Sequence, residues 1–171
     1  MTSPIHFFHA NGLPAETYRD LLNNLDGEVV SPISILGKGI SSVEEGYDDF
    51  VDEVIEHASK TKGEAIAIGH SFGGTLSLLA EARQPGLFKT IILLDPPIFS
   101  RTKRIIISIL RRLRLEYLVN PAKKSMKRME LFTSREEALE YFSTKGLFKE
   151  IPKSTIELYV NHGLEEDEAE L

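Results

Sequence analysis

Short apolar runs alternate with stretches of helical spacing along the first hundred residues of this chain. Four such runs, each nearly continuous, lie at residues 5–8, 29–34, 65–68 and 90–94. Strands that are apolar on both sides are typical of a parallel sheet covered by helices on both faces. Helical spacing fills the intervals at residues 15–25, 43–60 and 74–83. The alternation predicts an α/β protein with a doubly wound parallel sheet of about four strands.

A five-residue pattern, Gly69-His70-Ser71-Phe72-Gly73, follows the third apolar run and precedes a helical stretch. In a strand–turn–helix setting, Gly-x-Ser-x-Gly places a nucleophilic serine on a sharp turn. A serine on so tight a turn has strained backbone angles, and its neighbours must be small. We therefore predict that Ser71 is a nucleophile. The alternative is a plain turn between a strand and a helix.

A second loop of interest follows the first apolar run and reads His9-Ala10-Asn11-Gly12-Leu13-Pro14. Its glycine can supply a positive φ, so a simple loop is the alternative to a functional one. Active sites on open parallel sheets lie beyond the carboxyl ends of the strands. We expect this loop, Ser71 and Asp95, which follows the fourth run, to lie on that rim.

These segments resemble the α/β-hydrolase superfamily, in particular bacterial members with a helical cap. The loop Asn11-Gly12-Leu13-Pro14 is similar to the family's His-Gly-x-Pro loop, with Asn in place of His. The likeness extends to residues 8–12, 93–96, 134–138 and 159–163. It implies strand order 2-1-3-4, a hydrolase core at residues 1–97 and a helical cap at 98–163. The remaining residues, 164–171, form an acidic tail. In such relatives two further strands and the catalytic histidine follow the cap, so the resemblance implies a truncated domain.

The resemblance also implies roles for single residues. The backbone N–H groups of Leu13 and Phe72 would form an oxyanion hole, in which each donor is worth roughly 3–4 kcal/mol of barrier. Asp95 is a candidate for the catalytic acid, and a turn-forming aspartate is the alternative. A serine at position 71, where dehalogenases and epoxide hydrolases carry aspartate, argues against those two activities. The residues expected to support the loops are His9, Asn11, Gly12 and His70.

A catalytic base is harder to find. The family's chain order is serine, acid, histidine, and His162 alone among the histidines lies downstream of Ser71. The surrounding residues predict a helix end capped by Gly163, so a solvated helix-end histidine is the alternative to a base. We expect His6 to pack in the core and His57 to be solvated on an acidic helix.

The segment after Asp95 predicts four helices, at residues 101–117, 123–132, 135–143 and 154–162. Ser134 and Glu137 have the spacing of a capping box at the start of the third helix. Residues 101–128 carry ten Lys or Arg and one acid, within a chain of net charge −6. Three alternatives stay open: a solvated basic face, a surface for anionic substrates, and a membrane-surface or nucleic-acid patch. Aromatic residues do not interleave the run as in a nucleic-acid platform, so we expect no nucleic-acid partner.

The chain has 171 residues, about one domain, and contains no cysteine. Disulfides and thiolate sites are thereby excluded, and a reducing, cytoplasmic location is expected. The first residues lack the pattern of a secretory signal, and no apolar run approaches the length of a membrane span. No phosphate-binding loop or cluster of metal ligands is evident, so we expect no cofactor and no metal.

Two functions follow as hypotheses. The first is a serine hydrolase that acts on a small-molecule ester, thioester or similar acyl substrate. The second is a catalytically incompetent remnant that binds a ligand or partner. Under either, the apolar fourth strand has no predicted neighbour on one side, and an open edge of this kind favours self-association and marginal stability.

Overall fold

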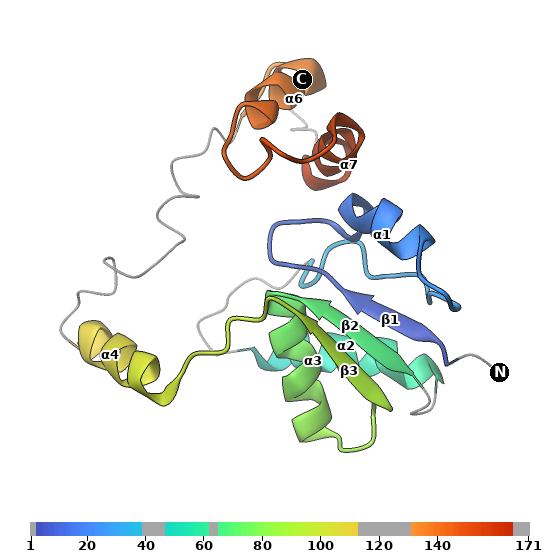
Figure 1. Ribbon diagram of the computed structural model, residues 1–171, viewed down its shortest axis with the longest axis vertical. Helices are drawn as coiled ribbons and strands as arrows, with labels where there is room; N and C mark the ends of the chain where they lie inside the picture. Colours follow the sequence, from blue (N-terminus) through green and yellow to red (C-terminus); the bar gives the residue numbers. More distant parts are fainter. Residues whose placement is uncertain (1–2, 39–46, 62–64, 113–130, 166–171) are drawn as a thin grey trace, which may run out of the picture.

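The computed structural model describes residues 3–38, 47–61, 65–112 and 131–165. Its centre is a parallel sheet of three strands, in the order β1 (Ile5–Phe8), β2 (Ile66–His70) and β3 (Thr90–Leu94) (Figure 1). Ile5 lies beside Ile66, and Ile66 lies beside Thr90. The predicted α/β class, the parallel sheet and the relative order of these three strands are confirmed.

The predicted strand at residues 29–34 is wrong in extent, because it is reduced to one bridge between Val29 and Ile5. The bridge lies on the free side of β1, where the order 2-1-3-4 requires it. Ile5 N–H donates to the Glu28 carbonyl at 2.8 Å, and Val30 N–H donates to the Ile5 carbonyl at 2.9 Å. A parallel ladder would next need the N–H of residue 32, and Pro32 has none. The ladder therefore stops after these two hydrogen bonds.

Side chains of β1 alternate between two helical layers, as a doubly wound sheet requires. Phe7 lies in a cluster with Ile68, and η1 (Ala15–Tyr18) and α1 (Arg19–Asn23) cover that face. Phe8 points to the opposite face, which α2 (Asp48–Ala58) and α3 (Phe72–Arg83) cover. Figure 1 shows α1 on one side of the sheet and α2 and α3 on the other. A short η2 (Ser59–Thr61) continues α2.

The helices beyond the sheet follow the predicted segments where the structure describes them. They are α4 (Arg101–Arg112), α6 (Arg135–Ser143) and α7 (Lys153–Gly163). The end of the first predicted helix and nearly all of the predicted helix at 123–132 lie outside the described residues. Ser134 caps α6 by accepting a hydrogen bond from Glu137 N–H at 3.2 Å. Gly163 belongs to α7 itself, so its predicted role as a left-handed cap is wrong.

Helices α6 and α7 share an apolar cluster that is separate from the sheet. Phe142 and Tyr159 lie at its centre, with ring centroids 5.0 Å apart. Leu13, from the loop after β1, packs against this cluster. At the end of α7, a side chain on Gly163 would lie 3.2 Å from the Pro14 ring. The α6–α7 pair therefore contacts the loop after β1, whereas α4 stands apart from the sheet in Figure 1.

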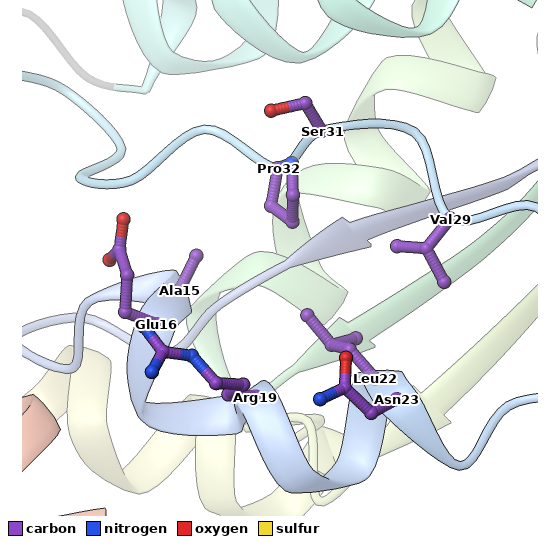
Figure 2. Close-up of a pocket in the computed structure, with 8 residues that line it drawn as sticks. All are labelled: Ala15, Glu16, Arg19, Leu22, Asn23, Val29, Ser31 and Pro32. Atoms are coloured by element: carbon purple, nitrogen blue, oxygen red, sulfur yellow. The ribbon is translucent and has the colours of Figure 1, made fainter.

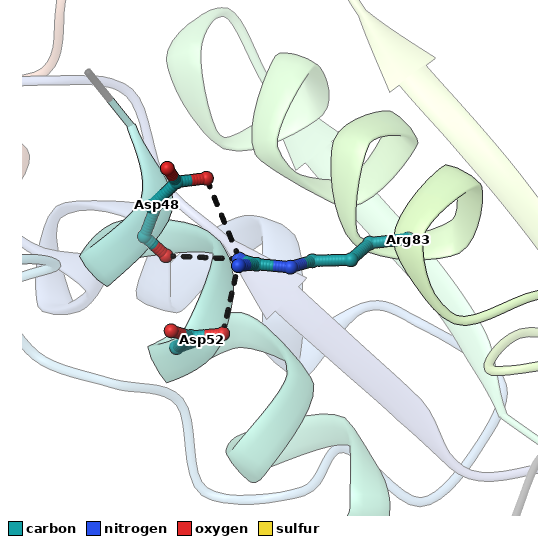
Figure 3. Close-up of polar contacts among 3 residues, drawn as sticks. All are labelled: Asp48, Asp52 and Arg83. Atoms are coloured by element: carbon teal, nitrogen blue, oxygen red, sulfur yellow. Dashed lines mark hydrogen bonds and ion pairs between the residues drawn. The ribbon is translucent and has the colours of Figure 1, made fainter.

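An ion pair joins the two helices below the sheet (Figure 3). Arg83 of α3 lies 3.1 Å from an Asp52 carboxylate oxygen and 3.6 Å from one of Asp48, both on α2. The Arg83 side chain is 45% exposed, and exposed ion pairs contribute little because water and salt screen them. We expect Arg83→Ala to lower the free energy of unfolding by less than about 1 kcal/mol in urea titrations. Lys153→Ala, on the exposed start of α7, is the control, and a loss above about 2 kcal/mol would contradict a screened surface pair.

Candidate active site

Ser71 occupies the sharp turn between β2 and α3. Its φ of 49° and ψ of −111° lie in the left-handed half of the backbone map, where a residue with a Cβ is strained. The Ser71 N–H donates to the Leu94 carbonyl at 2.8 Å, which ties the turn to the end of β3. Ser71 is the N-cap residue of α3, yet its hydroxyl makes no capping hydrogen bond. The Ser71 hydroxyl is therefore not used to cap α3.

The glycines around Ser71 are required by close backbone packing. A Cβ on Gly73 would overlap the Phe8 carbonyl group and lie 2.6 Å from the His9 carbonyl oxygen. A Cβ on Gly69 would lie 2.6 Å from the Gly74 nitrogen. The prediction that the neighbours of Ser71 must be small is confirmed. The packing also presses the start of α3 against the loop after β1.

The first turn of α3 offers hydrogen-bond donors next to Ser71. Phe72 is the first residue of the helix, so its N–H has no partner within the helix. The helix dipole adds a partial positive charge at this end. The Phe72 ring packs against Tyr47 and Phe50, with centroids 5.5 and 5.4 Å away. An oxyanion formed at Ser71 would therefore meet an anchored donor.

The other predicted oxyanion donor is already used in a turn. Leu13 N–H donates to the Ala10 carbonyl at 3.1 Å. Gly12, exposed like Asn11, has a φ of 73° at the third position of this turn, where type II turns require glycine. For Leu13 to bind an oxyanion, its N–H would have to share or leave the bond to Ala10.

His9 anchors the loop after β1 through hydrogen bonds of both ring nitrogens. Its Nδ1–H donates to the Ala10 carbonyl at 2.8 Å, and its Nε2 accepts from Leu36 N–H at 2.7 Å. These bonds need the neutral ring with hydrogen on Nδ1. Burial lowers the pKa of His9, although the Ala10 carbonyl opposes this in part. His9 thus acts as a neutral structural link, since neither ring nitrogen is free to take a proton.

His70, directly before Ser71, points toward Tyr18. The Tyr18 hydroxyl lies 2.7 Å from His70 Nδ1 and accepts from Ala10 N–H at 3.3 Å. Because the hydroxyl accepts from Ala10, its hydrogen is free to be donated to His70 Nδ1. Burial raises the pKa of Tyr18 and keeps the hydroxyl protonated. This chain of bonds links the loop after β1 to the end of β2 and gives His70 a positioning role.

The prediction that His57 is solvated is wrong. His57 is 4% exposed, and its Nδ1 lies 2.9 Å from Nδ1 of His6, 51 residues earlier in the chain. His57 Nε2–H donates to the Ser31 carbonyl at 2.9 Å, so its Nδ1 accepts from His6 Nδ1–H. His6 Nε2 lies 2.9 Å from the Thr61 hydroxyl, whose single hydrogen it shares with the Ala58 carbonyl oxygen at 3.1 Å. His6 is fully buried, as predicted.

This buried pair is held in its neutral form. Burial is the main cause that lowers the pKa of His6 to about 4, with further contributions from His57 and Lys60. Burial also lowers the pKa of His57. The two rings lie between β1 and α2 and hold the chain at Ser31 where its ladder with β1 has ended. Neither His6 nor His57 is available as a catalytic base.

Asp95 and His162 are not joined to Ser71 by any hydrogen bond in the described part of the chain. Asp95 lies at the carboxyl end of β3, as expected, but is exposed and has a φ of 44°. That conformation is common for aspartate in turns. His162 is exposed in the last turn of α7. The structure thus brings together Ser71, Phe72 and the loop after β1, and does not join to them either Asp95 or His162, the residues predicted as candidate acid and base.

A cavity that does not include Ser71 lies between η1 and α1 on one side and residues 29–32 on the other (Figure 2). It has a volume of about 260 Å³, and Figure 2 shows Arg19 and Leu22 of α1 opposite Val29 and Pro32. Pro32 is the sequence feature that could have indicated this cavity, because it ends the ladder and the chain then diverges from β1. Its lining residues are Ala15, Glu16, Arg19, Leu22, Asn23, Val29, Ser31 and Pro32.

Among the described residues, no group of three or more His, Cys, Asp or Glu side chains is arranged to hold a metal ion. Of the described helices, none has the length and apolar character needed to cross a membrane.

Several solved structures share this fold. The peroxisomal α/β-hydrolase Lpx1 of Saccharomyces cerevisiae gives a TM-score of 0.61 at 16% identity, over 93% of this chain and 49% of that one. The thioesterase domain from the curacin biosynthetic pathway gives 0.62 at 14% identity, over 94% and 59%. MenH from S. aureus gives 0.56 at 18% identity, over 96% and 61%. This chain therefore spans between 49% and 61% of the length of these three structures.

At the level of sequence, no protein-family model matches the chain. A comparison with curated proteins also found no match.

Proposed function

We propose that this chain, which has the α/β-hydrolase fold, is a serine hydrolase that acts on an ester, thioester or similar acyl substrate. The observation that carries the proposal is the backbone of Ser71, with a φ of 49° and a ψ of −111° at a strand-to-helix turn. Strain of this kind persists only where the surrounding packing imposes it, and it is concentrated at functional sites. Here the close packing of Gly69 and Gly73 imposes it.

In the proposed reaction, Ser71 Oγ attacks the acyl carbonyl carbon while its proton passes to a base. The carbonyl oxygen becomes an oxyanion, which Phe72 N–H and the released Leu13 N–H bind. The leaving group departs with a proton, and water then hydrolyses the acyl-enzyme to restore Ser71. In this proposal α6 and α7 act as a cap over the substrate, since their apolar cluster meets Leu13.

This mechanism does not yet assign a residue as the general base. Four of the five histidines are unsuited to it: His6 and His57 are bonded to each other, and His9 and His70 position the loops. His162 is exposed in the last turn of α7, and to serve as the base it would have to come within hydrogen-bond reach of Ser71.

A second candidate function, binding without catalysis, is favoured because no histidine is hydrogen-bonded to Ser71 in the described part of the chain. Without a base at Ser71, the chain would keep the fold and the oxyanion donors but lack turnover, and would bind an acyl ligand or a partner. A residual acceleration of roughly 10³–10⁴ over water can survive loss of the triad. The two candidates therefore differ in the activation of Ser71.

Labelling with a fluorophosphonate probe, read by intact mass, tests the proposal. We expect one adduct on the wild-type chain and none on Ser71→Ala, because the probe reacts with an activated serine. Ser143→Ala, at an exposed serine of α6, is the matched control and should keep the adduct. His162→Ala then tests the remaining histidine. A folded wild-type chain that forms no adduct would favour the second candidate.

A further inference from the structure

The carbonyl oxygen of Ala10 accepts two hydrogen bonds within the loop after β1. His9 Nδ1–H donates to it at 2.8 Å, and Leu13 N–H donates to it at 3.1 Å. A carbonyl oxygen has two lone pairs, so these two donors use its full capacity. Ala10 is buried, at 6% exposure, where a carbonyl without any donor is costly. One of the two bonds can therefore break while the other keeps the carbonyl satisfied.

The bond from His9 is the fixed one of the two. His9 is 3% exposed, and its Nε2 accepts from Leu36 N–H at 2.7 Å, which requires the ring hydrogen to be on Nδ1. The ring cannot change its tautomer without losing the bond to Leu36. Ala10 is also held through its own N–H, which donates to the Tyr18 hydroxyl at 3.3 Å. The Ala10 carbonyl and the ring that donates to it therefore stay in place together.

The bond from Leu13 closes a turn that has room to rearrange. Asn11 and Gly12, its two central residues, are exposed, and a Cβ on Gly12 would meet no heavy atom of the described chain within 4 Å. The planar peptide group between Gly12 and Leu13 can rotate as a unit, which redirects the Leu13 N–H with little movement of its Cα. Glycine tolerates the change of backbone angles that this rotation requires. The Leu13 side chain can thus stay packed against the α6–α7 cluster while its N–H turns.

We propose that His9 is a positioning residue for the oxyanion hole. Its Nδ1–H keeps the Ala10 carbonyl satisfied when the Leu13 N–H turns away to bind an oxyanion. The inference rests on the proposed function, in which Leu13 supplies the second donor beside Ser71. The start of α3 lies against this loop, since a Cβ on Gly73 would lie 2.6 Å from the His9 carbonyl oxygen. Without the His9 donor, the same rotation would leave a buried carbonyl unsatisfied, which costs more than exchanging one bond for another.

Two substitutions separate the roles of the two His9 nitrogens. A glutamine can place its amide oxygen where Nε2 lies, so His9→Gln keeps an acceptor for Leu36 N–H and removes the donor to Ala10. An asparagine can place its amide N–H where Nδ1 lies, so His9→Asn keeps the donor to Ala10 and removes the acceptor for Leu36. The two variants are matched controls for each other, because each loses one hydrogen bond of the same buried side chain.

Amide hydrogen exchange followed by NMR tests the release on the full chain without any ligand. We expect the Leu13 amide to exchange at least about fivefold more slowly in His9→Gln than in the wild type, because opening the turn then leaves the Ala10 carbonyl without a donor. In His9→Asn the rate should stay within about twofold of the wild type. A purely structural role for His9 would loosen the loop in both variants and speed this exchange. Circular dichroism checks that both variants fold.

The wild-type chain gives a second measurement that needs no variant. The His9 Nδ1–H should be protected from exchange at least about tenfold more than the Leu13 amide, because only the Leu13 bond breaks when the turn opens. Equal protection would mean that the two bonds break together and would overturn the proposal. Unchanged or faster Leu13 exchange in His9→Gln, or the same change in both variants, would also overturn it.

An alkylboronic acid, which forms a tetrahedral adduct with a nucleophilic serine, separates this inference from the proposed function. We expect it to bind the wild type, to shift the Leu13 amide resonance and to leave the His9 Nδ1–H resonance in place. It should bind His9→Gln at least about tenfold more weakly, and it should not bind Ser71→Ala. Equal affinity for the wild type and His9→Gln would overturn the positioning role. A folded wild-type chain that binds no boronate would overturn the proposed function, while the exchange rates still decide whether His9 permits the release of Leu13.

Discussion

Gly73→Ala is expected to destabilise the protein by at least about 3 kcal/mol, a large part of the 5–15 kcal/mol that holds a typical domain together. The added Cβ would overlap the Phe8 carbonyl group and lie 2.6 Å from the His9 carbonyl oxygen. Both contacts are with backbone, so no side chain can rotate away to make room. Either β1 or the start of α3 must shift, and both belong to the packed centre of the fold.

Urea unfolding followed by circular dichroism would measure this loss. Gly146→Ala is the matched control, because a Cβ on Gly146 has no heavy atom within 4 Å. We expect the control to change the free energy of unfolding by less than about 0.5 kcal/mol. Equal midpoints for the two variants would contradict the close approach of Phe8 to Gly73. They would also remove the reason for the strained backbone at Ser71.

Lowering the pH from 7 to 5 is expected to cost roughly 1–2 kcal/mol of stability through His6. The unfolded chain takes up a proton on this residue near the ordinary histidine pKa of 6.5, whereas the folded chain does so only near 4. The unfolded state therefore binds more protons between these values, and stability rises with pH across this window. The contribution is fully present above 6.5 and is lost as the pH falls toward 4. Burial lowers the pKa of His57 and His9 as well, which adds to the same trend.

Urea titrations at pH 7, 6 and 5 would measure this slope, above the range in which ordinary carboxyl groups titrate. His6→Asn removes the titrating ring and should flatten the slope, whatever its cost at pH 7. His162→Gln removes an exposed histidine and should leave the slope as in the wild type. A wild-type chain with the same stability at pH 7 and 5 would contradict a neutral buried pair.

Local patterns predicted much of the fold. The strands at 5–8 and 90–94 and the helix at 135–143 have the bounds that the structure shows. Each depends on a short-range cause: a continuous apolar run between turns, or a serine cap followed by Glu137. The failed strand at 29–34 also had a local cause, because Pro32 lacks the N–H that the ladder needs. That proline limits the strand to its first residues.

Some features of the candidate site were also predictable from adjacent residues, and others were not. The pattern around Ser71 predicted the strained turn and its glycine neighbours, since backbone geometry at a tight turn depends on adjacent residues. The use of Leu13 N–H within its own turn was not predicted. It depends on where Ala10 is held by His9 and Tyr18, which are placed by other parts of the chain.

The sequence by itself determined the parallel sheet, the position of Ser71 at the carboxyl end of β2 and the need for glycine beside it. These follow from periodicity and from steric limits on neighbouring residues. Only the tertiary structure decided that His57, predicted to be solvated on its helix, is buried against His6, and that no hydrogen bond joins His162 or Asp95 to Ser71 in the described part of the chain. The protonation state of a histidine depends on its burial, and the use of a histidine as a base depends on its distance from the serine. Both are set by which distant segments pack together, and the sequence does not give those spatial distances.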